Sequence, residues 1–401
     1  MLKIAIIGAG ASGLMSAINI KRECSDIDVT VFDSNSRVGK KLITTGNGRC
    51  NITNKCLDKK YFHSKNIDKA MSVINRFNLD DTVKFFKSIN IPIKDDGGNK
   101  LYPASFQAQS LVDALRFECA KLGVNLICDT KILSIKSKNN LFILNGQYNF
   151  DKVVIATGGK AAPKTGSNGE GYNFLTQFGH KLIKPKESIV PIKTDIEFIK
   201  SAKGMKADVV LTLKSNQQSV SDYGEILFTE YGLSGPVTLQ VSRFASINES
   251  VRAYINFLPD YDIADLLEEI KIRVSNCYEN RAENLLLGLI NKRIGFCILK
   301  KSGVSINDFA DGLNQYQINN IAKNLQNFEV EVKGVCGFEN AQTTIGGIDL
   351  SEFDDNLQSK ICKNLYACGE VLDVDGDCGG FNLQWAWSSG FVVAKSIVKS
   401  N

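Results

Sequence analysis

A glycine-rich turn close to the N-terminus constrains the fold more than any other feature of the sequence. The turn, GAGASG at residues 8–13, follows the apolar run of residues 2–7 and opens a stretch with helical spacing. Gly8 permits a tight turn, Gly10 lets a diphosphate approach the main chain, and Gly13 lets the helix pack closely on the strand. The free N–H groups at the start of that helix can bind phosphate. This strand–turn–helix unit predicts a parallel-sheet domain that binds a dinucleotide.

A second apolar run, Asp28–Phe32, ends at Asp33, 20 residues after the last glycine of the turn. A carboxylate at this strand end can accept hydrogen bonds from the hydroxyls of the cofactor's ribose. The turn and the acid together do not separate FAD from NAD. The loop of residues 39–54 favours FAD, because it is long and rich in glycine, asparagine, threonine and cations. Glycine turns form nests of N–H groups for anions, and Lys41 or Arg49 can balance the charge of a diphosphate.

Another glycine-rich segment, residues 368–384, joins the apolar strand Leu365–Cys368 to a helix predicted over Leu383–Val398. Its glycines can bring the main chain against a ligand. The helix start near Asn382 can stabilise negative charge on a reduced flavin ring. The three aspartates of this segment could instead form a calcium loop. The spacing lacks the glutamate that an EF-hand carries at its twelfth position, so we expect no metal site.

Changes in the pattern of apolar and turn residues along the sequence indicate three domains. Short strand patterns with turn residues begin near residue 187, helical periodicity replaces them near residue 260, and strand patterns return near residue 328. The expected bounds are 1–186 and 346–401 for the dinucleotide-binding domain, 187–259 and 328–345 for a small β-domain, and 260–327 for a helical insert.

Composition excludes several classes of protein. The formal net charge of +5 over 401 residues does not demand a nucleic acid, and we expect no DNA partner. The 11 cysteines include no CxxC pair, and there are two histidines. This pattern argues against a zinc ribbon, a redox dithiol and a disulfide scaffold, and it favours a reduced, cytoplasmic protein. No apolar stretch reaches the ~18 residues of a membrane span, so we expect no membrane partner, and the oligomeric state stays open.

Longer motifs carry a family resemblance. TGNGRCNITN at residues 45–54, GEILFTEYGLSGP at 224–236 and GEVLDVDGDCGGFNLQWAWSSG at 369–390 together resemble the BaiN/RdsA family of FAD-binding flavoproteins, also described as aminoacetone-oxidase-like. The resemblance covers nearly the whole chain. It implies an α/β fold class, in which a Rossmann-type FAD-binding domain of the glutathione-reductase and fumarate-reductase kind carries a β-barrel-like domain and a helical insert.

The resemblance also implies which residues contact FAD. They are Gly8, Gly10, Ala11, Ser12, Gly13, Asp33, Lys41, Thr45, Gly46, Gly48, Arg49, Cys50, Asn51, Ile132, Ala156, Thr157, Gly158, Gly369, Glu370, Asp373, Gly380, Asn382, Leu383 and Gln384. This sequence departs from the family at two positions. Glu230 stands where members usually carry a histidine, which puts any role of that histidine in doubt here. Lys100 stands where many members carry an arginine, and lysine lacks the bidentate pairing of arginine.

The activities described for the family differ in their substrates. Some members reduce a bile-acid-type enone, some oxidise small amino-ketones, and one branch reduces a uridine of ribosomal RNA to dihydrouridine. We expect an FAD-dependent oxidoreductase that transfers a hydride at flavin N5 to a C=C bond conjugated with a carbonyl. Its substrate is a small molecule or ribosomal RNA, and a non-enzymatic flavin redox sensor is the alternative. No second GxGxxG motif is present, so NAD(P)H would bind only transiently as the reductant.

Reduction of an enone also needs an acid opposite the hydride. Cys50 and Cys378 lie in the flavin-side motifs and Glu230 lies in the middle motif, so these three residues are the candidates. Each cysteine can equally be a small packing residue. The two tryptophans that follow the last glycines, Trp385 and Trp387, are expected to pack against the sheet.

An RNA substrate would further require a basic surface, because neutralised phosphates supply most of the affinity for RNA. We expect such a surface on a lid formed by the β-domain and the insert. The candidate cations of the insert are Lys292, Arg293, Lys300 and Lys301.

Overall fold

The computed structural model describes residues 1–216 and 218–400. These residues form two compact units, and we describe each unit by itself. The first unit joins Met1–Lys186 to the segment that begins at Gln342, and the second unit is Glu187–Ala341. The chain therefore returns to the first unit before residue 346, the position expected from the sequence. The return comes earlier because strand β19 (Thr343–Ile348) pairs with strand β12 (Leu182–Ser188).

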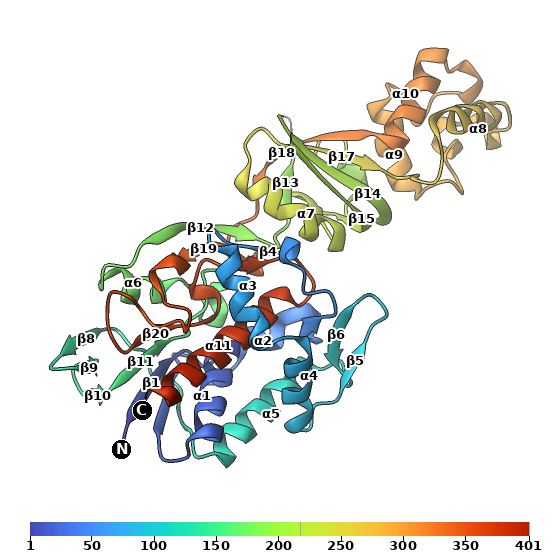
Figure 1. The fold of residues 1–401 in the computed structure, drawn as a ribbon. Coiled ribbons are helices and arrows are strands. Elements are labelled where there is room, and N and C mark those ends of the chain that lie inside the picture. The colour runs from blue at the N-terminus through green and yellow to red at the C-terminus, as the bar shows by residue number, and fades with distance from the viewer. Residues whose placement is uncertain (217, 401) are drawn as a thin grey trace. The chain divides into compact units, whose positions relative to one another are not determined.

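A five-stranded parallel sheet forms the centre of the first unit (Figure 1). Its order is β20-β11-β1-β2-β7, and every neighbouring pair is parallel. The strands are short and almost continuously apolar, as expected for a sheet that is covered on both faces. Their bounds are β1 Lys3–Ile7, β2 Asp28–Phe32, β7 Asn125–Ile127, β11 Lys152–Ile155 and β20 Leu365–Ala367.

Helices α1 and α5 of the first unit pack against this sheet. Helix α1 follows β1, and the C-terminal helix α11 lies beside it (Figure 1). A Cβ atom on Gly390 of α11 would stand 2.4 Å from the carbonyl oxygen of Ser12, so the two helices pack main chain against main chain. The helix bounds are α1 Ala11–Glu23, α2 Lys40–Thr44, α3 Ile67–Asn75, α4 Leu79–Ser88, α5 Ala108–Lys121, α6 Glu170–Thr176 and α11 Phe381–Lys399.

Both ends of the chain enter this sheet. Ile4 of β1 lies opposite Lys152 of β11 in the strand register, and the Lys152 ammonium donates to the hydroxyl of Ser400 at 2.7 Å. These contacts join the N-terminal and C-terminal parts of the chain within the first unit.

Smaller sheets extend the first unit. Their pairings are β3 with β6 and β6 with β5, β4 with β21, and β8 with β9 and β9 with β10. The bounds are β3 Thr53–Asn54, β4 Phe62–His63, β5 Ile93–Asp95, β6 Lys100–Pro103, β8 Ile135–Lys138, β9 Leu141–Leu144, β10 Tyr148–Phe150 and β21 Asp375–Gly376.

The second unit contains a closed barrel of six strands in the order β13-β16-β15-β14-β17-β18. Helix α7 (Pro236–Ile247) packs on it through Val237 and Val241, which are buried in the same apolar core as Leu211 and Ile226. The strand bounds are β13 Ile192–Thr194, β14 Lys206–Ser215, β15 Gln218–Phe228, β16 Gly232–Ser234, β17 Arg252–Asn256 and β18 Phe328–Val335.

A helical segment is inserted between β17 and β18. Its helices are α8 Ile263–Ser275, α9 Lys292–Lys301 and α10 Gln315–Gln326. Helix α9 begins at Lys292 because the side chain of Asn291 caps it there. The barrel and the insert share one apolar core, so their division into two domains remains a prediction.

Short 3-10 turns connect these elements. Their bounds are η1 Thr45–Gly48, η2 Lys59–Tyr61, η3 Pro163–Thr165, η4 Lys200–Ala202, η5 Tyr278–Asn280, η6 Ala282–Asn284, η7 Ala310–Gly312, η8 Leu350–Glu352 and η9 Gly369–Val371. Among residues 1–216 and 218–400, no helix is both long enough and apolar enough to cross a membrane.

Candidate cofactor site and active site

The glycine turn lies at the carboxyl end of β1, the edge of a parallel sheet at which ligands bind. A Cβ atom on Gly8 would stand 2.4 Å from the carbonyl oxygen of Ala156, and one on Gly13 would stand 2.0 Å from that of Gly8. These two glycines therefore serve the packing of β1, β11 and α1. A Cβ atom on Gly10 would meet no protein atom within 4 Å. Gly10 thus faces open space, as a residue that admits a diphosphate must.

Two long helices begin at this site without a side-chain cap. The N-cap of α1 is Gly10, and the N-cap of α11 is Gly380 in the left-handed region, with φ 94°. Neither helix has an acidic residue in its first turn. The first N–H groups of a helix need a partner, and together they carry a partial positive charge. Each of these two helix starts can therefore hold negative charge on a ligand.

Asp33 ties the end of β2 to the glycine turn. One carboxylate oxygen accepts the N–H of Ala9 at 2.8 Å, and the other accepts the main-chain N–H and the side-chain amide of Asn35 at 2.8 and 2.9 Å. The Asn35 amide also donates to the carbonyl of Thr165 at 3.1 Å. Since an ionised carboxylate has about four acceptor positions, Asp33 retains capacity for a ribose hydroxyl. The sequence did not reveal Asn35, which fixes the orientation of this acid.

The loop of residues 39–54 folds back against the glycine turn. Gly39 is left-handed, with φ 68°, and its N–H donates to the carbonyl of Ala9 at 2.9 Å. Asn47 and Cys50 are left-handed although they are not glycines. Such residues carry backbone strain and concentrate at functional sites.

Buried polar atoms without a partner support a ligand at this loop. Within the described residues, Asn51 Oδ1 and Thr157 Oγ1 are buried and have no hydrogen-bond partner. A Cβ atom on Gly380 would stand 2.8 Å from Asn51 Oδ1, so this atom lies beside the start of α11. Because buried polar atoms are almost always bonded, a bound group that bonds them is the simplest explanation. The open cradle at Gly10, the uncapped helices and these atoms all fit FAD.

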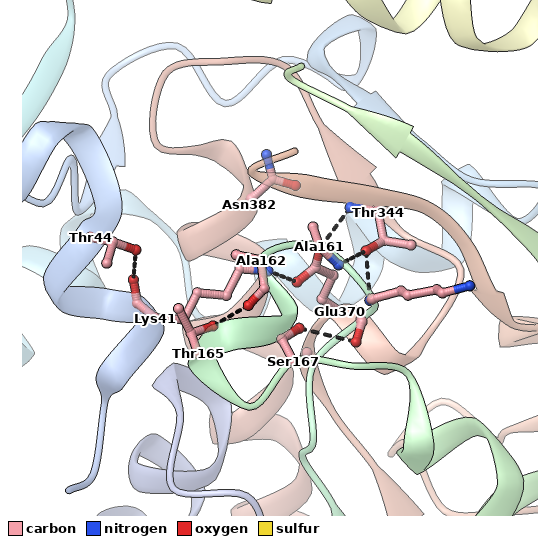
Figure 2. A network of polar contacts seen from close by, with 12 residues as sticks. Lys41, Thr44, Ala161, Ala162, Thr165, Ser167, Thr344, Glu370 and Asn382 are labelled. Atoms are coloured by element: carbon pink, nitrogen blue, oxygen red, sulfur yellow. Dashed lines mark hydrogen bonds and ion pairs between the residues drawn. The ribbon is translucent and has the colours of Figure 1, made fainter. Parts of the chain in front are cut away.

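An ion pair between Lys41 and Glu370 connects the loop of residues 39–54 to the glycine-rich segment of residues 368–384. Their charged groups lie 2.7 Å apart, and the other oxygen of Glu370 accepts the N–H of Thr344 at 2.6 Å (Figure 2). The Thr344 hydroxyl in turn accepts the N–H groups of Lys160 and Ala161. Sequence reasoning named Lys41 and Glu370 but missed Thr344, although the glycine pair that follows it in β19 was a possible signal.

The segment that follows β11, residues 156–159, is positioned by contacts inside the first unit. Ala156 is buried against the sheet, and its N–H donates to the carbonyl of Ile7. Gly158 is left-handed, with φ 73°, and the Ser167 hydroxyl donates to the carbonyl of Gly159 at 3.0 Å (Figure 2). Ile132, another predicted contact, is 5% exposed and lies in the apolar core.

In the segment of residues 368–384, the side chains of several predicted FAD contacts bond to other residues of the protein. Gln384 is fully buried, its carbonyl accepts the hydroxyls of Thr53 and Thr82, and its amide donates to the Phe77 carbonyl. This side chain therefore joins α11 to its neighbours in the interior. The Asn382 amide is bonded to both main-chain groups of Gly376.

Asp373 is also an interior residue. It is 5% exposed, and its carboxylate accepts the N–H of Lys65 at 3.1 Å. Burial, assisted by the nearby Asp375 and Asp349, raises the pKa of Asp373. No group of metal-ligating side chains large enough to hold an ion occurs in the part of the chain that the structure describes.

Two tryptophans fix α11 against the same segments. Trp385 donates its indole N–H to the Gly369 carbonyl at 3.0 Å, and Trp387 donates to the Ile52 carbonyl at 3.0 Å. Both side chains are buried, which confirms the prediction that they are packing residues.

The three predicted proton donors differ in their surroundings. Cys50 is fully buried, and burial raises the pKa of its thiol to about 12, which indicates a packing residue. Glu230 is a highly exposed residue of the second unit, paired with Lys203 at 2.7 Å. This pairing lowers the pKa of Glu230, so the group is a carboxylate and a poor proton donor at neutral pH. Cys378 is half-buried in the first unit, and burial raises the pKa of its thiol.

Tyr102 is a candidate proton donor that the sequence did not reveal. It lies on β6, its ring is 5.7 Å from the Arg49 guanidinium, and its edge faces Gly46. Burial and the nearby Asp96 raise the pKa of Tyr102, while the Arg49 guanidinium lowers it. Tyr102 thus lies beside the loop of residues 39–54.

The fold and the site define a Rossmann-type dinucleotide-binding protein with a barrel. The solved structure of 3-ketosteroid Δ1-dehydrogenase from Sterolibacterium denitrificans has the same overall fold, with a TM-score of 0.51, 11% identity and 100% of both chains covered. The expected fold class is therefore confirmed.

The chain belongs to the family described as the HI0933-like protein Rossmann domain, whose model matches residues 2–396. It is 31% identical to the 3-dehydro-bile acid delta(4,6)-reductase of Clostridium scindens, over 99% of both chains. It is 30% identical to the ribosomal RNA dihydrouridine synthase of Escherichia coli, over 98% of this chain and 97% of the relative. The resemblance to the BaiN/RdsA family is thereby confirmed.

Proposed function

We propose that this protein is an FAD-dependent oxidoreductase that reduces a C=C bond conjugated with a carbonyl. The observation that carries the proposal is the pair of uncapped helix starts at the ligand edge of the sheet, α1 and α11. One suits the diphosphate of FAD, and the other suits the negative charge of a reduced flavin ring. The two relatives support the reaction type, because a bile-acid dienone and a uridine both contain a C=C bond conjugated with a carbonyl.

Bound FAD would supply the hydride, and the residues of this chain supply binding, orientation and a proton. The N–H groups at Gly10 and the start of α1 bind the diphosphate, and Asp33 orients the adenosine ribose. The loop at Asn51 and the start of α11 hold the flavin. The Tyr102 hydroxyl gives the proton to the substrate carbon opposite the hydride, because a phenol keeps its proton at neutral pH. NAD(P)H acts as a transient reductant in the cytoplasm.

The test uses the purified full-length protein. Heat release of its chromophore should yield FAD, because the ribose acceptor Asp33 has no use in FMN. Under anaerobic conditions NADH or NADPH should bleach the flavin, and a 3-oxo-Δ4 steroid or a uridine-containing ribosomal RNA fragment should restore its colour. Recovery of FMN, or a chain without affinity for FAD, would contradict the proposal. A reduced flavin that only oxygen can reoxidise would contradict the reductase activity.

The second candidate substrate, RNA, is supported by the charge of the first unit. Residues outside 187–341 carry 32 lysines and arginines and 23 acids, whereas residues 187–341 carry 16 and 20. The unit that contains the candidate cofactor site therefore carries the excess of positive charge. The β-domain and the insert, which were expected to form a basic lid, carry a net negative charge.

The four cations expected on that lid also have partners within the second unit. Lys292 pairs with Glu283 at 3.5 Å, and Arg293 donates to the carbonyl of Ser201 at 2.7 Å. Lys300 donates to the carbonyl of Glu197, and Lys301 to that of Glu329. These contacts favour a structural role for the four cations.

A further inference from the structure

The ion pair of Lys41 and Glu370 joins two segments that lie 329 residues apart in the sequence. Its charged atoms are 2.7 Å apart, and the side chains are only 25% and 18% exposed. By comparison, both side chains of the Lys131–Glu170 pair in the same unit are about half exposed. An ion pair that is largely withdrawn from water interacts more strongly than a surface pair, because the effective dielectric constant is lower.

Neighbouring contacts fix both members of this pair beside the start of α1. Lys41 lies in α2, which follows Gly39, and the Gly39 N–H is bonded to the glycine turn at Ala9. Glu370 follows Gly369, where an added Cβ atom would stand 2.4 Å from the hydroxyl oxygen of Ser12. The pair therefore stands at the ligand edge of the sheet, next to the helix start that suits the diphosphate.

The carboxylate of Glu370 is also held on its second side. Its other oxygen accepts the N–H of Thr344, and Thr344 binds the main chain of residues 160–161 through its hydroxyl (Figure 2). A Cβ atom on Gly159 would stand 3.0 Å from the carboxyl carbon of Glu370. Three segments of the site are thus built around one carboxylate, whose charge the Lys41 ammonium balances.

We propose that Lys41 and Glu370 are a charge-matched positioning pair that sets both the affinity for FAD and the reduction potential of the bound flavin. The proposal rests on the proposed function, because it places FAD at this edge. Glu370 holds the ammonium group and the 159–161 segment in position. Together the two charges cancel, so the reduced flavin experiences no net charge from this pair.

The two single variants should shift the potential in opposite directions. Glu370→Gln leaves an unpaired ammonium, which stabilises the reduced flavin and raises the midpoint potential. Lys41→Met leaves an unpaired carboxylate, which destabilises the reduced flavin and lowers the potential. Since Gln keeps an oxygen for the Thr344 N–H and Met keeps the length of the lysine stem, both variants should fold. The double variant should return close to the wild-type potential.

The experiment measures the midpoint potential, the dissociation constant of FAD and the unfolding midpoint of the FAD-free protein for all four chains. Each single variant should bind FAD at least about tenfold more weakly, which corresponds to 1.4 kcal/mol. The fold-loss of FAD affinity in the double variant should be smaller than the product of the two single fold-losses. Matched controls are Lys333→Met and Glu331→Gln, which break an exposed ion pair of equal length, 2.7 Å, on strand β18. They should change neither the potential nor the affinity.

Equal potentials in all four chains, or shifts in the same direction, would overturn the proposal and leave a purely structural pair. A lower unfolding midpoint alone would have the same meaning. These outcomes are distinct from failure of the proposed function, which shows in the wild-type protein as absent FAD binding or absent substrate reduction.

Discussion

Single residues of the glycine turn separate folding from cofactor binding. The surroundings of Gly10 are open, whereas a Cβ atom on Gly13 would stand 2.0 Å from the Gly8 carbonyl oxygen. We expect Gly10→Val to leave the unfolding midpoint of the FAD-free protein nearly unchanged and to abolish FAD binding, because its side chain fills the diphosphate space. Gly13→Ala should lower the unfolding midpoint by overpacking, worth roughly 1–3 kcal/mol. A Gly10→Val protein that still holds FAD would mean that the turn is only structural.

Tyr102 carries the second prediction at this scale. Loss of its hydroxyl in Tyr102→Phe should slow substrate reduction by about 10²–10⁴-fold, the usual contribution of a general acid. FAD content and the rate of flavin reduction by NAD(P)H should not change, because the phenol acts only on the substrate. Cys378→Ala is the comparison variant, and its substrate reduction should stay within a factor of about two. If Cys378→Ala is the slow variant instead, the thiol is the donor.

Residue types and their spacing indicated the turn at residues 8–13, the strand end at Asp33 and the loop of residues 39–54, because local backbone geometry determines these features. The partners of these residues were not predictable in the same way. Asn35 reaches the carbonyl of Thr165, and Glu370 meets Lys41, over separations that only the folded sheet closes. The burial of Gln384, which engages its side chain in the interior, likewise depends on packing that no spacing rule describes.

Whole elements were predicted best where they are short, apolar and bounded by glycine. The strand Asp28–Phe32 has the bounds that the sequence indicated. Residues 66–90 carry apolar residues at helical spacing, yet they form the two helices α3 and α4, because Asn78 and Asp81 form a capping box that starts α4. The apolar spacing indicates a buried face on both helices, but it does not indicate where one helix ends and the next begins.

The contact between α1 and α11 gives a prediction for an element. Gly390→Ala should lower the unfolding free energy by roughly 1–3 kcal/mol, because its methyl group would stand 2.4 Å from the Ser12 carbonyl oxygen. Gly295→Ala in α9 is the control, since its methyl group would meet only the Leu286 side chain, at 3.5 Å. There alanine should stabilise the helix, by up to about 1 kcal/mol. Chemical unfolding measures both effects, and equal stability of Gly390→Ala and the wild-type protein would contradict the packing described for the two helices.

For the whole molecule, charge decides where an RNA substrate would bind. The composition gave only the total of +5, which hides an excess of basic residues in the first unit and of acids in the second. Two cations of the first unit flank the candidate site through aromatic contacts. Lys60 lies over Tyr61, which stacks on Phe381 at the start of α11. Lys94 lies over Phe106, which packs against Tyr102.

We therefore expect Lys60→Ala combined with Lys94→Ala to weaken binding of ribosomal RNA fragments and to flatten its salt dependence. Removing one cation that neutralises a phosphate of single-stranded RNA lowers the log–log slope by about 0.7. The control is Lys292→Ala combined with Lys300→Ala in the second unit, which should leave the slope unchanged, because both side chains already bond within that unit. FAD content should be equal in all three chains. The measurement is a set of binding isotherms at several salt concentrations. A change of slope in the control pair alone would return the RNA surface to the second unit. Wild-type protein without affinity for these fragments at low salt would leave the small enone as the substrate class.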